Sequence, residues 1–121
     1  MPKTFSAKTS PTVLASVADY FKVLSEVSRL QILGCLRVKA MNGKEIMEQT
    51  GLGQANLSKH LKALTQAGIL SRHPQGVSVY YEIADPMIFQ LCELVCDRIT
   101  EQVQQKAQEF AEFHILNNSS K

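Results

Sequence analysis

The feature that most constrains this chain of 121 residues is a long apolar stripe near its C-terminus. Asp85 and Pro86 together form a typical start of a helix, a capping residue followed by a proline suited to the first helical position. Apolar residues then recur at helical spacing, at Ile88, Leu91, Val95, Ile99, Val103, Ala107 and Phe110. A helix of about 28 residues is about 40 Å long, longer than a domain of this size is wide. We therefore expect the stripe to pack against a second copy of the chain, the alternative being a solvent-bridging helix.

Length and composition fit a single globular domain. We expect that domain over residues 12–116, with flexible tails over 1–11 and 117–121. Because 45% of the residues are hydrophobic and 20% are charged, the composition argues against wholesale disorder. The sequence shows neither an apolar run long enough to cross a membrane nor an apolar secretory signal, and its three cysteines do not suggest a disulfide framework. These features predict a cytoplasmic protein with no membrane partner.

Apolar periodicity predicts four helices before the pattern changes. They cover residues 12–24, 26–38 and 44–50, and a fourth, marked by apolar residues from Ala55 to Leu64, closes at Gly68. A turn is expected at Asn42-Gly43. After Gly68 a period of two predicts strands over 69–72 and 77–83, joined by a turn at Pro74-Gln75-Gly76. Helices, a hairpin and a long final helix in this order predict a mainly α winged helix-turn-helix fold with the hairpin as its wing.

The net charge of +2 hides an uneven distribution. From Arg37 to Arg72, six bases face two acids, whereas from Asp85 to Phe113 six acids face two bases. A basic segment that coincides with a predicted helix-turn-helix favours contact with phosphates, and the acidic helix favours contact with a partner subunit. The alternative is a random scatter of charge over a solvated surface.

The fourth predicted helix carries residues suited to DNA recognition. Within Q-A-N-L-S-K-H-L-K-A-L, three leucines face inward. The residues left outward and suited to DNA are Gln54, Asn56, Ser58, Lys59 and Lys62. Gln and Asn pair with adenine in the major groove, Ser donates hydrogen bonds, and Lys neutralises phosphates. His60 lies beside them, and the pattern leaves open whether it packs in the core or donates to a phosphate. A polar helix face without any partner is the other interpretation.

From about Ala18 to Ile99 the sequence resembles the ArsR/SmtB family of bacterial winged-helix repressors. The resemblance is carried by L-S-E-V-S-R-L-Q-I-L from Leu24, Q-A-N-L-S-K-H-L-K-A-L-T-Q-A-G-I-L from Gln54, and G-V-S-V-Y-Y-E-I-A-D from Gly76. It implies a homodimer joined through the first and last helices that represses its own operon until an inducer releases the operator DNA. The fourth helix is then the recognition helix, with contacts from Gln54, Asn56, Ser58, Lys59 and His60. The wing, which includes Arg72, Gln75 and Ser78, is expected to contact flanking DNA.

Two inducer sites of the family do not carry over. The zinc site on the last helix falls on Asp85, Met87, Arg98 and Glu101, so both carboxylates remain but a thioether and a cation replace the two imidazoles. The cysteines of the arsenic and cadmium site in the third helix fall on Asn42 and Lys44. The resemblance therefore leaves the inducer open.

Three thiols offer other routes to an inducer. Cys92 and Cys96 are four residues apart on the predicted last helix, about 6 Å apart on one face, and Cys35 lies in the second helix. Cys92 and Cys96 are suited to bind a soft ion such as As(III). Alternatively, the resemblance to the sulfide- and redox-responsive branch of the family implies that an oxidant or a reactive sulfur species joins Cys35 to one of them. A third interpretation is that the cysteines only pack, as free cysteines commonly do.

The remaining function classes receive little support from the sequence. It contains no glycine-rich phosphate loop and no nucleophile motif, which argues against an enzyme. A winged-helix regulator or protein-interaction module with structural cysteines, and with another inducer or none, is the alternative that stays open.

Overall fold

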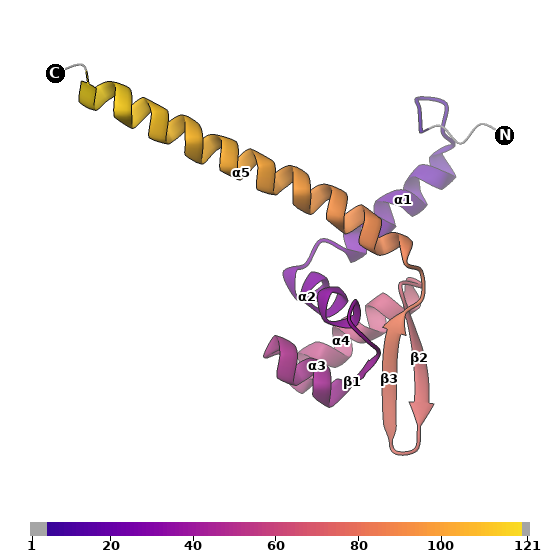
Figure 1. Cartoon of the computed structure of the whole chain (residues 1–121). Helices are drawn as coiled ribbons and strands as arrows, with labels where there is room; N and C mark the ends of the chain where they lie inside the picture. The colour runs from indigo at the N-terminus through magenta and orange to yellow at the C-terminus, as the bar shows by residue number, and fades with distance from the viewer. Residues whose placement is uncertain (1–4, 120–121) are drawn as a thin grey trace. The chain divides into compact units, whose positions relative to one another are not determined.

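A computed structural model describes residues 5–119, and their side chains as far as residue 116. Its elements are α1 (Pro11–Val23), α2 (Val27–Leu36), β1 (Met41–Asn42), α3 (Gly43–Thr50), α4 (Gln54–Gln66), β2 (Leu70–Gln75), β3 (Ser78–Ile83) and α5 (Met87–Ser119) (Figure 1). The chain divides into two compact units, one that ends at Asp85 and one that begins at Pro86. None of the helices in the described part is both long and apolar enough to cross a membrane.

The first unit is built around helices α2, α3 and α4 and a small sheet. Its buried apolar side chains come from all of these elements and include Ile32, Leu33, Leu36, Met41, Ile46, Leu57, Leu61, Leu64, Ile69 and Leu70. The three leucines of α4 were predicted to face inward, and all three are buried. Helices α3 and α4 with the short turn between them, followed by the β2–β3 hairpin, confirm the predicted mainly α winged helix-turn-helix fold.

The start of α3 differs from the sequence prediction. Asn42 does not lie in a free turn but caps the helix: its Oδ1 accepts from the Glu45 N–H at 2.9 Å, and its own N–H donates to Glu45 Oε1 at 3.0 Å. Met41 and Asn42 also form strand β1, which pairs with β3 opposite Tyr81 and Tyr80. Two residues are too few to show a period of two, so the sequence pattern did not predict this strand.

The hairpin turn lies slightly later than predicted. Pro74 and Gln75 belong to β2, paired with Val79 and Ser78, so only Gly76 and Val77 form the loop. Gly76 has φ of 62° and Val77 does not have a positive φ, the pattern of a type II′ turn. Pro74 is tolerated in the strand because β2 is at the edge of the sheet, in the order β1-β3-β2, where a missing N–H costs little.

The structure describes residues on both sides of the predicted domain of residues 12–116. Helix α1 starts at Pro11, where Ser10 Oγ accepts from the Val13 N–H at 3.2 Å, and residues 6–9 form a hydrogen-bonded turn within the predicted tail. Helix α5 continues over residues 117–119, where a tail was predicted. Asn and Ser each cost a helix less than about 0.7 kcal/mol, too little to stop it at residue 116. Residues 1–4 and 120–121 lie outside the described residues.

Candidate nucleic-acid interface

Helix α4 presents a polar face beside its buried leucines. The side chains of Gln54, Asn56, Ser58, Lys59 and Lys62 are all exposed. The helix begins at Gln54, so the first two of these residues lie in its first turn, the part of a recognition helix that reaches base edges first. The structure thus brings these five predicted residues together on the accessible side of one helix.

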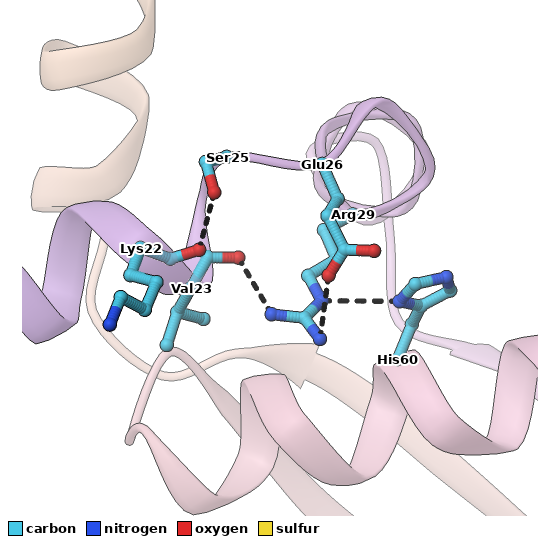
Figure 2. A network of polar contacts seen from close by, with 6 residues as sticks. All are labelled: Lys22, Val23, Ser25, Glu26, Arg29 and His60. Carbon is cyan, nitrogen blue, oxygen red and sulfur yellow. Dashed lines mark hydrogen bonds and ion pairs between the residues drawn. The ribbon is translucent and has the colours of Figure 1, made fainter.

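His60 does not belong to that face, and its burial favours the core-packing alternative over the expected contact with DNA. Only 3% of its surface is exposed, and its Nδ1 accepts a hydrogen bond from Arg29 Nε at 3.1 Å (Figure 2). An imidazole that is buried and already partnered is not available to a phosphate. His60 instead continues the inward stripe, three residues after Leu57 and four before Leu64.

Arg29 on α2 links α4 to the end of α1 and the start of α2 (Figure 2). Its Nη1 donates to the carbonyl oxygen of Val23 at 3.1 Å, and its Nη2 pairs with Glu26 Oε2 at 2.8 Å. Together with the bond to His60, these contacts join the end of α1, the start of α2 and the inner side of α4. The sequence analysis did not find this role, because an arginine three positions before a core isoleucine carries no signal of its distant partner.

The wing places its predicted residues on different surfaces. Arg72 and Gln75 are exposed, and Ser78 is half-buried. Arg72 pairs with Tyr81 across the hairpin. Because side chains alternate along a strand, Arg72 and Gln75 lie on opposite faces. The wing therefore offers Arg72 on one face of the hairpin and Gln75 beside its tip.

The cations of α4 and the wing are not compensated by nearby carboxylates. Within residues 5–116, Lys59, Lys62 and Arg72 make no ion pair, whereas Lys39 is paired with Glu45 at 3.6 Å. Three unpaired positive charges on neighbouring elements favour the binding of a polyanion.

The three cysteines are free thiols in different surroundings. Cys96 is exposed on α5, Cys92 is half-buried on the same helix, and Cys35 is half-buried in α2, in the other unit. Burial raises the pKa of the Cys92 thiol, and the charge of Cys96 raises it further. Burial also raises the pKa of the Cys35 thiol. Among the residues that the structure describes, no three His, Cys, Asp or Glu side chains are grouped to hold a metal ion.

Helices α1 and α5 each carry an apolar face that their own unit leaves uncovered. No residue of α1 is buried, and Phe21 is 52% exposed. On α5, Val95, Val103 and Phe110 are 50%, 61% and 71% exposed. Apolar faces of this length normally mark a protein-protein contact.

Comparison with known proteins shows which protein family the sequence and the fold of this chain resemble. The pattern of bacterial regulatory proteins of the ArsR family matches residues 26–72, which run from the start of α2 into β2. The transcriptional repressor SdpR of Bacillus subtilis is 33% identical over 65 residues, which cover 54% of this chain and 72% of SdpR. The cadmium resistance regulatory protein CadC of Listeria innocua is 34% identical over 80 residues, 65% of this chain and 67% of CadC. The matched regions span between 58% and 79% of such relatives.

A solved structure agrees with this assignment. The homodimeric winged helix-turn-helix DNA-binding domain of Mb0332 from Mycobacterium bovis, a possible ArsR-family regulator, superposes with a TM-score of 0.69 at 28% identity. The superposition covers 81% of this chain and 91% of that domain. The likeness therefore extends beyond the segment that the family pattern matches.

Proposed function

Because the chain belongs to the ArsR family of bacterial regulatory proteins, we propose that it is a transcriptional repressor that binds operator DNA through α4 and the β2–β3 wing. One observation carries this proposal. Amide, hydroxyl and ammonium groups share the exposed side of a helix whose opposite side is fixed in the core. This is the side-chain chemistry that reads base edges and neutralises phosphates.

Within α4 the roles divide by side-chain type. Gln54 and Asn56 in the first turn have the amide geometry for bidentate pairing with adenine. Ser58 donates to a base or a phosphate, and Lys59 and Lys62 neutralise phosphates. The proposal omits His60, which the Arg29 hydrogen bond holds in the core.

We further propose that the protein binds DNA as a homodimer assembled through α1 and α5. The uncovered apolar faces of both helices support this, since a second copy would remove them from water. The Mb0332 domain, which is homodimeric, supports it by analogy. A two-fold dimer presents two α4 helices to half-sites one DNA turn apart.

Loss of two α4 side chains tests this assignment. We expect Gln54→Ala combined with Lys59→Ala to weaken binding to a labelled duplex from upstream of the gene by at least about tenfold, measured by fluorescence anisotropy. The matched control is Lys8→Ala with Gln31→Ala, which removes the same residue types from exposed positions before α1 and on α2. Equal affinities of the two double variants would refute the role of α4.

The inducer that we propose is directed at thiols. Cys92 and Cys96 lie one turn apart on α5, where a soft ion such as As(III) can bind both sulfurs. A relative that is named for cadmium resistance supports a thiophilic ion as the inducer. An oxidant or reactive sulfur species that links Cys35 to an α5 thiol is the second candidate, supported by the exposure of Cys96. Either reaction changes the helix that we assign to the dimer contact, and through it the spacing of the two α4 helices.

Serine substitutions separate these candidates. We expect Cys92→Ser with Cys96→Ser to abolish the release of DNA by arsenite and by a persulfide donor, measured on the reduced protein by anisotropy and mass spectrometry. Cys35→Ser is expected to abolish only the response to the persulfide donor. An unchanged response of the Cys92/Cys96 double variant to both reagents would show that the cysteines are structural.

A further inference from the structure

A small cavity lies between the recognition helix and the wing. On α4 it is lined by Ser58, Lys62 and Thr65, which recur at helical spacing, and on the hairpin by Arg72 and Tyr81. The last two are direct partners across β2 and β3, so their side chains share one face of the sheet. The cavity is therefore built by elements that the core fixes relative to one another.

The groups that line the cavity are suited to an anion. Lys62 and Arg72 contribute positive charge, no lining residue is acidic, and neither cation makes an ion pair in the described part of the chain. Ser58 and Tyr81 add hydroxyl donors. Thr65 Oγ1 is buried and has no hydrogen-bond partner, which is unfavourable for a polar atom. An anion that enters the cavity would accept hydrogen bonds from the hydroxyls of Ser58 and Tyr81 and lie beside both cations.

The size of the cavity limits what it can hold. Its volume is about 190 Å³, below the roughly 300–1,000 Å³ of sites for drug-sized organic ligands. A cavity of about 440 Å³ between α1 and α4 is larger, but Asp19 lines it and repels anions. The cavity beside the wing therefore fits one small anionic group.

We propose that this cavity seats a single phosphate of the DNA backbone, held jointly by α4 and the wing. Lys62 and Arg72 neutralise the phosphate, and the hydroxyls of Ser58 and Tyr81 donate to its oxygens. The phosphate site rests on the proposed function and extends it. It assigns to one phosphate those side chains that were expected to contact DNA separately. It also adds Tyr81, which the sequence analysis did not select. One shared phosphate would fix the depth and register at which the first turn of α4 enters the groove.

The salt dependence of DNA binding tests whether the two cations share one phosphate. Each phosphate that a protein neutralises contributes about 0.9 to the slope of log K against log salt concentration. We expect Lys62→Gln with Arg72→Gln to reduce the slope by about 0.9 per subunit if they share a phosphate, and by about 1.8 if they contact two. A reduction near the larger value, or none, would overturn the proposal.

The Tyr81 hydroxyl provides a second test that leaves charge and ring packing intact. We expect Tyr81→Phe to weaken DNA binding about tenfold with an unchanged salt slope. Tyr80→Phe removes the same group from the adjacent position, on the other face of β3, and should bind as the wild type does. Equal DNA affinities of the Tyr81→Phe and Tyr80→Phe variants would contradict a phosphate site shared by α4 and the wing, provided that urea unfolding shows both variants to be folded.

A protein that does not bind DNA at all would give a result different from a DNA-binding protein that lacks this phosphate site. If the wild-type protein binds no duplex, the anion site is tested alone by titrating inorganic phosphate and following the backbone amide signals of Ser58 and Arg72 by NMR. Saturable shifts that are absent from the Lys62/Arg72 double variant would support an anion site without DNA. Shifts of equal size in both proteins would exclude it.

Discussion

At the scale of single residues, burial governs the chemistry of the proposed sensor. A thiol reacts as its thiolate, and the pKa of the half-buried Cys92 thiol is raised by desolvation first and by the charge of Cys96 second. Raising the pKa of an acid lowers its ionised fraction at neutral pH. Cys92 is therefore a slow nucleophile unless a metal ion displaces its proton, which favours metalloid binding over direct oxidation as its mode of response.

This leads to a prediction about alkylation rates. We expect iodoacetamide to modify Cys92 more slowly in the folded protein than in urea at pH 7.5, and the folded rate to reach half of its plateau above about pH 8.5, the midpoint of an ordinary thiol. The measurement is peptide mass spectrometry over a pH series. The Cys96→Ser variant, which removes the smaller cause, should raise the Cys92 rate slightly at a given pH. A half-maximal rate at or below about pH 8.5 would show that the pKa is not raised.

His60 shows why residue type alone misassigns a helix position. Its spacing from Leu57 and Leu64 belongs to the inward stripe, but imidazole chemistry also suits a phosphate contact. The deciding contact comes from Arg29, which is 31 positions away along the chain. A pairing of that separation has no signal in one sequence, whereas the exposed residues of α4 followed directly from its apolar period.

At the scale of elements, helices were predictable where periodicity extends over several turns. Helix α4 and the hairpin follow from runs of apolar residues with clear periods. Strand β1 is set by its pairing with β3, a tertiary contact that leaves no pattern in two residues. The Asn42 cap had a local signal, since Asn followed three positions later by Glu45 resembles a capping box. The sequence analysis instead expected a turn at Asn42-Gly43.

The length and the exposed apolar residues of helix α5 indicate that the helix packs against a second subunit. With 33 residues it is about 50 Å long, and its apolar residues stay exposed well beyond the first turns. Sequence periodicity predicted the stripe and the need to cover it. It did not predict that the helix continues through residues 117–119, because chain-end composition suggested a tail.

At the scale of the whole molecule, charge and apolar surface are segregated. Unpaired cations gather on α4 and the wing, whereas acids dominate the segment from Asp85 to Phe113, which also carries an uncovered apolar stripe. One surface therefore suits a polyanion, and the other suits a second subunit. The proposed repressor needs both, because a single α4 reads too few base pairs for a specific operator.

Selection of bound duplexes from a pool of random sequence tests this account most directly. The account predicts that the wild-type protein enriches an inverted repeat with half-site centres about one DNA turn, or a multiple of it, apart. It also predicts that the Gln54/Lys59 double variant loses the preference within each half-site. No enrichment, an unpaired single site, or the same sequences selected by that variant would contradict the claim that two copies of α4 read the operator.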